Sequence, residues 1–290
     1  MWPIDPAGLR PPEGWRGWPD GKKFAFILTH DVETLGGQEK VKELAGIEID
    51  LGFRSSFNFV PERYAVSTEL RAWLRDHGFE VGVHDLNHDG NLYSSKKAFA
   101  KRSVRINEYL HEWRATGFRS GAMFHNLEWI GMLNIDYDGS TFDTDPFEPQ
   151  PDGVGTIFPF CIKRDSGNPY VELPYTLAQD FTLFILFREK SIEVWKTKLD
   201  WIANAGGMAL VNVHPDYIDF RGPRVGRELY HVQKYDQLLD YCNEKYKGEF
   251  WNVIPGQLAR HILTHPVYLA SNQNKPGKIT NGIIKTRFGL

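Results

Sequence analysis

The chain has 290 residues, of which 41% are hydrophobic and 24% are charged, and its formal net charge is −3 at pH 7. This composition is typical of a globular protein, and the small negative charge gives no reason to expect nucleic acid or an anionic membrane as a partner. The two cysteines, Cys161 and Cys242, are too few for a disulfide framework and are most simply buried thiols. No apolar run is long enough for a membrane span, and the N-terminus lacks the basic and apolar regions of a signal peptide. We therefore expect a cytoplasmic protein without membrane insertion.

Predicted strands and helices alternate along the first half of the chain. Residues 1–22, rich in proline, glycine and tryptophan, form an irregular lead-in. The predicted strands are short apolar runs that end in polar residues, and they cover residues 23–31, 53–60, 79–84, 117–121 and 135–140. The predicted helices between them cover residues 36–52, 67–78, 94–117 and 125–134. Alternating strands and helices of this size predict a parallel sheet with right-handed crossovers.

The alternation stops at residues 140–187, which contain several prolines and glycines. Three strand-like segments in this region predict a β-rich insertion; they are residues 156–162, 170–175 and 181–187. The alternation then resumes with a helix at 189–207, a strand at 208–214, a helix at 232–246, a strand at 250–254 and a helix at 255–264. At this length we expect one barrel domain over residues 23–268, followed by a polar arm at 269–290.

Polar side chains gather where the predicted strands end. In parallel α/β folds the functional site lies at the carboxyl ends of the strands. The residues at these ends are Asp31 and Glu33, His84 and His88, Arg119, and His214. Another acidic cluster, Asp138, Asp143 and Asp145, follows the predicted strand at 135–140 and is typical of a solvated turn.

The strand-end residues suit metal-assisted hydrolysis. Two imidazoles and one carboxylate leave positions open on a divalent ion such as Zn²⁺, where a water and a carbonyl oxygen can bind. A second carboxylate would accept the proton of that water, a histidine across the site would protonate the leaving group, and an arginine would keep the carboxylate ionised. The alternative is structural: loop histidines bonded to the backbone, carboxylates that cap a helix, an arginine salt bridge and a histidine that merely ends a strand.

The segments that carry these residues resemble the five motifs of the polysaccharide deacetylases (carbohydrate esterase family 4). LTHDVE, HDLNH, GFRSG, YDGSTFD and LVNVHP follow one another in the family's order across roughly residues 23–216. The resemblance implies an α/β fold, a distorted (β/α) barrel of seven or eight parallel strands, here with the β-rich insertion. It also implies a metal-dependent enzyme that removes acetyl groups from N-acetylated sugars or polysaccharides, with zinc as the expected ion.

The resemblance also implies a metal site. His84 and His88 match the metal-binding pair of the family, and Asp31 matches its base. The family's first motif usually has two adjacent aspartates, but here the second position is Val32 and the next carboxylate is Glu33. We therefore expect Glu33 as the third ligand and keep Asp31 as an alternative ligand.

The remaining roles come from the later motifs. Arg119 matches the arginine that orients the base, His214 matches the acid, and the backbone N–H near Ala122 would contribute to an oxyanion hole. Asp85 stands where the family usually has serine or threonine, and the fourth motif lacks its usual tryptophan. The leading interpretation is a deacetylase of surface-polysaccharide metabolism. The alternatives are hydrolysis of another linear or cyclic amide, and a catalytically decayed carbohydrate-binding barrel; the sequence leaves the oligomeric state open.

Overall fold

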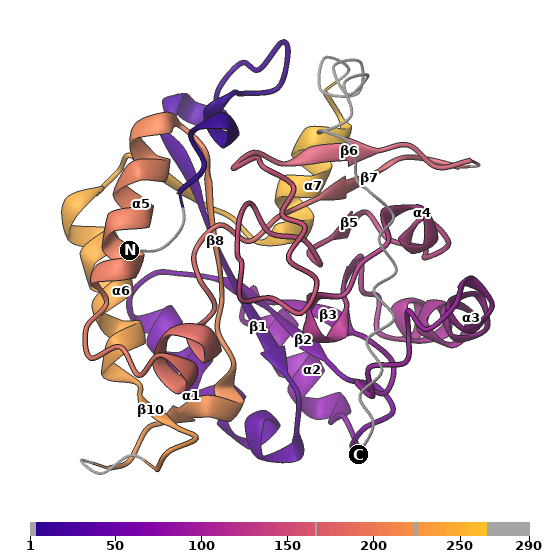
Figure 1. Cartoon of the computed structure of the whole chain (residues 1–290). Coiled ribbons are helices and arrows are strands. Elements are labelled where there is room, and N and C mark those ends of the chain that lie inside the picture. Colours follow the sequence, from indigo (N-terminus) through magenta and orange to yellow (C-terminus); the bar gives the residue numbers. More distant parts are fainter. Residues whose placement is uncertain (1–3, 166, 223–225, 266–290) are drawn as a thin grey trace.

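The computed structural model of the chain describes residues 4–165, 167–222 and 226–265 (Figure 1). The predicted arm at 269–290 lies outside these residues. None of the helices within the described ranges is both long and apolar enough to cross a bilayer. Cys161 and Cys242 are both buried and are not joined to each other by a disulfide.

A strongly curled, mostly parallel sheet occupies the centre of the molecule (Figure 1). Its strands are β1 (Phe24–Val32), β2 (Ser55–Phe59), β3 (Glu80–His84), β4 (Gly117–Arg119), β5 (Tyr137–Asp138), β6 (Phe160–Ile162), β7 (Tyr170–Glu172), β8 (Met208–Asn212) and β11 (Phe250–Asn252). They run in the order β11-β1-β2-β3-β4-β5-β7-β6, and β8 also pairs with β1. Among the strands of this sheet in the described residues, β6 and β7 alone pair in antiparallel fashion. A second, two-stranded sheet contains β9 (Ile218–Asp219) and β10 (Tyr230–His231).

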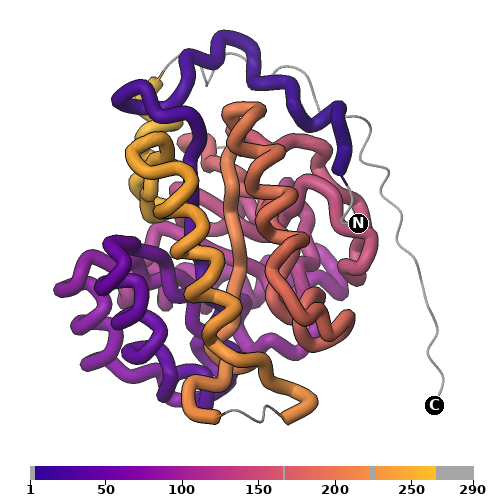
Figure 2. The backbone as a smooth tube through the Cα atoms, turned by 90° about the vertical axis from the view of Figure 1, so that its left-hand side faces the viewer, coloured from indigo at the N-terminus to yellow at the C-terminus, as the bar shows by residue number. Residues whose placement is uncertain are grey.

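Helices follow most of the parallel strands and cover the outside of the sheet (Figures 1 and 2). The α-helices are α1 (Leu35–Asp50), α2 (Thr68–Asp76), α3 (Lys96–Glu112), α4 (Leu127–Ile130), α5 (Glu193–Ala205), α6 (Gln233–Lys245) and α7 (Pro255–Leu263). Short helical turns are η1 (Pro6–Leu9), η2 (Pro19–Gly21), η3 (Gly121–Met123), η4 (Phe181–Leu186) and η5 (Pro215–Tyr217). The hydroxyls of Thr34, Ser67 and Ser95 cap α1, α2 and α3 by accepting a backbone N–H from the first turn.

Strand β1 is the centre of the sheet, and all nine of its residues are buried. Residues 24–26 pair with β11 and residues 28–32 with β2, so these two strands share one edge of β1. Strand β8 pairs with residues 25–29 along the other edge. Because β1 is covered on both edges and both faces, its carboxyl end places Asp31 inside the molecule, where the neighbouring strands also end.

The chain after β5 closes the sheet into a distorted barrel. The backbone around Phe142 pairs with Tyr175, and the N–H groups of Thr176 and Leu177 donate to the carbonyl of Leu210 on β8. These bonds join the β5 side of the sheet to β8. Strand β7 pairs in parallel with β5, so it belongs to the main sheet.

The strands and helices predicted on either side of residues 140–187 are found, with ends that differ by a few residues. Within that region the predicted strand at 181–187 is wrong, because the chain forms the helical turn η4. The carboxylate of Asp180 accepts the N–H of Phe181, and Phe184 packs edge-on against Trp195. A continuous apolar run has the same pattern in a buried strand and in a buried helix, so periodicity could not distinguish them.

Candidate metal and catalytic site

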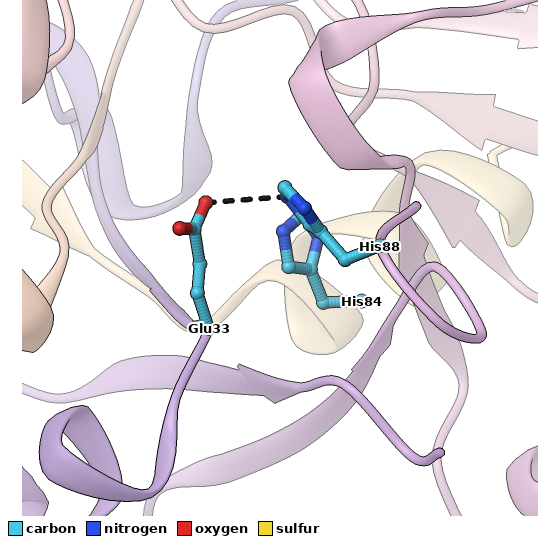
Figure 3. Close-up of side chains that lie close together, drawn as sticks. All are labelled: Glu33, His84 and His88. Carbon is cyan, nitrogen blue, oxygen red and sulfur yellow. Dashed lines mark ion pairs between the residues drawn. The ribbon is translucent and has the colours of Figure 1, made fainter. Parts of the chain in front are cut away.

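Three of the predicted ligands lie together at the carboxyl ends of β1 and β3. One ligand atom each from Glu33, His84 and His88 lies within 4.8 Å of the others. Glu33 points toward the two imidazole rings, and its Oε1 lies 3.2 Å from Nε2 of His88 (Figure 3). His88 has a φ of 52°, a left-handed conformation that turns the loop after His84 so that the two ring centroids lie 4.9 Å apart.

The two imidazoles have the chemistry of metal ligands. Nδ1 of His84 lies 3.1 Å from the carbonyl oxygen of Arg119, and because a carbonyl only accepts, Nδ1 carries the proton and Nε2 keeps its lone pair. Nε2 of His84 is buried without a hydrogen-bond partner, whereas Nε2 of His88 is buried beside Oε1 of Glu33. Burial lowers the pKa of His84, which favours the neutral, ligating form. A buried pair of imidazole nitrogens beside a carboxylate fits a divalent metal ion.

Asp31 lies next to this group but is not part of it. Its Oδ2 atom is 4.0 Å from Nε2 of His84. The side-chain amides of Asn58 and Asn212 donate to its two carboxylate oxygens, at 3.0 and 2.8 Å. Burial alone would raise the pKa of Asp31, but the charges of His84 and Arg119 and the Asn58 hydrogen bond hold it well below its usual value. Asp31 is therefore a buried, strongly ionised carboxylate.

Arg119 is held rigidly beside Asp31. Its Nε donates to the carbonyl of Gly139 and its Nη1 to the hydroxyl of Thr29, both at 2.9 Å. The same Nη1 lies 3.5 Å from Oδ2 of Asp31. The guanidinium is almost fully buried, so its charge acts on Asp31 with little screening by water.

His214 also lies beside Asp31 and has a carboxylate partner of its own. Its Nε2 is 4.0 Å from Oδ2 of Asp31, while its Nδ1 lies 2.7 Å from Oδ1 of Asp180. Oδ2 of Asp180 accepts the backbone N–H of His214 and the hydroxyl of Tyr230. Burial alone would lower the pKa of His214, but the charge and hydrogen bond of Asp180 outweigh it and raise this pKa to about 10.

Asp180 was not predicted from the sequence as a site residue, nor were Asn58 and Asn212. Asp180 lies in the region predicted as an insertion, directly before the apolar run predicted as a strand. One signal was present: a single carboxylate between two apolar segments is typical of a helix cap or of the partner of a buried group. Asp180 is both, since it also accepts the N–H of Phe181.

The acidic cluster after β5 is not the solvated turn that we predicted. Asp138, Asp143 and Asp145 are 0%, 3% and 2% exposed, respectively. Asp143 forms a 2.7 Å ion pair with the buried Lys198 of α5, and Asp145 accepts the hydroxyl of Tyr175. These carboxylates are buried because their segment closes the barrel, which the local sequence does not reveal.

Asp85, which departs from the family pattern, anchors the loop that contains Ala122. Its Oδ2 accepts the N–H of Gly121 at 3.2 Å, and its Oδ1 accepts the N–H of Leu86. Ala122 has a φ of 50°, a conformation that needs such support in a residue other than glycine. The departure at Asp85 therefore has a structural role at the predicted oxyanion-hole segment.

Gly82 of β3 makes room for the amide that supports Asp31. A Cβ atom at this position would lie 2.1 Å from Oδ1 of Asn58. We expect Gly82→Ala to displace the Asn58 amide from Asp31 and to reduce the free energy of unfolding by about 1–3 kcal/mol. Gly46→Ala is the control, because nothing lies within 4 Å of its added Cβ. Equal free energies of unfolding for the two variants, measured by urea denaturation, would show that this close packing does not hold the Asn58 amide in place.

No family model matches the chain, and no curated protein matches it in sequence. Solved structures do match its fold. A protein from Mycobacterium smegmatis described as a polysaccharide deacetylase is 20% identical with a TM-score of 0.65, covering 84% of this chain and 91% of its own. PuuE allantoinase is 15% identical with a TM-score of 0.66, covering 92% and 99%. A Pseudomonas aeruginosa PAO1 protein described as a polysaccharide deacetylase is 13% identical with a TM-score of 0.60, covering 90% and 97%. The chain thus has the distorted barrel fold seen in polysaccharide deacetylases and in an allantoinase.

Proposed function

We propose that the protein is a metal-dependent hydrolase that removes an acetyl group from an N-acetylated sugar or polysaccharide. One observation carries this proposal: the buried Nε2 atoms of His84 and His88 lie beside the carboxylate of Glu33, while Oδ2 of Asp31 lies 4.0 Å from Nε2 of both His84 and His214. The shared fold of the deacetylases supports it.

In this proposal Glu33, His84 and His88 hold the ion, and Asp31 remains outside its ligand set. A divalent ion such as zinc, when bound there, would polarise the amide carbonyl and make a water more acidic. The hydrogen bonds from Asn58 and Asn212 favour Asp31 as the base, because they occupy both of its carboxylate oxygens and fix the carboxylate beside His84.

Asp31 and His214 divide the proton transfers. Asp31 is ionised and accepts a proton from the attacking water, while Arg119 holds it in place. His214 is protonated and donates from Nε2 to the leaving nitrogen, because Asp180 holds its Nδ1 side. The backbone N–H near Ala122 would stabilise the negative charge that develops on the carbonyl oxygen.

A second candidate function is the opening of a cyclic amide, which the likeness to PuuE allantoinase favours. Both reactions break a C–N amide bond and need a base for water and an acid for the leaving nitrogen. The products differ, since a deacetylase releases acetate whereas a cyclic amide gives a single ring-opened molecule. Acetate release and ring opening should therefore be screened in parallel with purified protein.

The metal site can be tested without a known substrate. We expect one divalent ion per chain, and His84→Ala should weaken its binding by at least ~10-fold. The control is His77→Ala, since His77 lies at the end of α2 and stacks on Trp73. Metal content by elemental analysis should be unchanged in the control and lost in a His84→Ala, His88→Ala double variant. Full occupancy in the double variant would overturn the assignment, and native protein that binds no metal would favour the catalytically decayed carbohydrate-binding barrel.

A further inference from the structure

The turn η5, which follows β8, contacts Glu33 at both its backbone and its side chain. The hydroxyl of Tyr217 donates to Oε2 of Glu33 at 3.2 Å. Oδ2 of Asp216 accepts the backbone N–H of Glu33 at 2.9 Å, and its Oδ1 accepts the hydroxyl of Thr34 at 2.5 Å. Because Oε2 is engaged in this way, Oε1 is the oxygen that faces His88.

Asp216 of η5 packs tightly against the first turn of α1. A Cβ atom at Gly37, in the first turn of α1, would lie 2.3 Å from Oδ2 of Asp216. The glycine therefore lets η5 pack directly against the start of α1, whose cap is Thr34. The backbone of Glu33 is thus fixed, and its carboxylate is contacted by Tyr217 at Oε2 and by His88 at Oε1.

We propose that Tyr217 is a positioning residue for the metal site, which directs Oε1 of Glu33 toward the imidazoles by holding Oε2. The inference rests on the proposed metal binding by Glu33, His84 and His88. A carboxylate ligand whose outer oxygen is held loses less conformational freedom when it binds an ion, and removal of such outer contacts typically weakens metal binding by about 10–100-fold.

The ring of Tyr217 also packs beside His214, so the test needs a substitution that keeps this ring. Its ring lies 5.2 Å, centroid to centroid, from His214 and also 5.2 Å from Phe181. Tyr217→Phe keeps the ring beside His214 and removes only the hydroxyl. Loss of metal affinity in this variant would therefore report the contact with Glu33 and not a change in packing.

The test measures zinc binding to the full chain by competition with a chromophoric chelator at constant pH. Tyr217→Phe should raise the zinc dissociation constant by about 10-fold or more. Tyr241→Phe is the matched control, because it also removes a hydroxyl that donates to a carboxylate, that of Asp200 on α5. In a Glu33→Gln background, Tyr217→Phe should have little further effect, since the hydroxyl acts through the Glu33 carboxylate.

The outcomes separate this inference from the proposed function. If the native chain and Tyr241→Phe bind zinc and Tyr217→Phe binds it equally well, the positioning role is overturned while the metal site stands. The positioning role is likewise overturned if Tyr217→Phe weakens binding as strongly in the Glu33→Gln background. If the native chain binds no divalent ion at all, both the metal site and the inference fail. Thermal unfolding of the metal-free variants should be alike, which shows that the loss of affinity does not come from a damaged fold.

Discussion

Replacing Asp31 with asparagine should lower kcat by roughly 10²–10⁴-fold while the fold and the metal remain. The change is nearly isosteric, so the barrel should tolerate it, but an amide cannot accept the proton of the attacking water. Asn58 and Asn212 each donate an amide N–H to Asp31, and asparagine can accept only one of these bonds. A modest loss of stability should therefore accompany the large loss of turnover.

Metal affinity decides which role Asp31 has. If Asp31 is the base, Asp31→Asn keeps zinc affinity within a few fold, whereas Glu33→Gln weakens zinc binding measurably, by about 10-fold or more. If Asp31 is a ligand, the two variants lose zinc to a similar extent, and the division of labour proposed above is wrong. Asp152→Asn is the control for the substitution itself, because Asp152 lies on the surface beside His125.

The alternation of side chains along β1 explains why the sequence pointed to both carboxylates. His30 faces outward, where its Nε2 lies 2.6 Å from Glu48 of α1, whereas Thr29 and Asp31 face inward toward Arg119. Successive residues of a strand point to opposite faces, so Glu33 joins Asp31 on the inner side and Val32 packs in the core. Glu33, two residues after Asp31, therefore lies on the same side of the chain as Asp31.

The strand-end rule predicted most of the site because it depends only on topology. Glu33, His84, Arg119 and His214 lie at or just beyond the carboxyl ends of parallel strands, and those ends meet at one edge of the sheet. Asp180 could not be found in this way, because it follows no strand of the alternating pattern. It reaches His214 only after the chain beyond β7 has bonded to β8 and closed the barrel.

His214→Ala should lower kcat by roughly 10²–10⁴-fold and remove the alkaline limb of the pH–rate profile, while metal stays bound. The acid form of His214 is required, and its pKa is raised to about 10 by Asp180, so activity should persist through neutral pH and fall as the pH rises toward that value. A bound cation nearby would lower the pKa of His214 and move the alkaline limb to a lower pH.

The acidic limb of the pH–rate profile has another origin. The pKa of Asp31 is held well below its usual value and that of Glu33 is lowered to about 2, so protonation of His84 and His88, which competes with the metal, should set it.

Asp180→Asn tests the cause of the raised pKa. Without the Asp180 carboxylate, burial lowers the pKa of His214, so the alkaline limb should move to lower pH while some activity remains. Tyr230→Phe is the control, because it removes another bond to Asp180 and leaves the bond to Nδ1 of His214 intact. Stability provides a second measurement. A histidine whose pKa is raised in the folded state stabilises the fold fully below about pH 6.5, and this contribution is lost as the pH rises toward 10. Asp180→Asn should therefore flatten the alkaline decline of the unfolding free energy.

An unchanged pH–rate profile and full kcat in His214→Ala would mean that another group donates the proton. Asp85 and the carboxylates of residues 138–145 would then be the next candidates, but Asp85 already accepts two backbone N–H groups and Asp143 is paired with Lys198, so neither is free to take over the role without rearrangement.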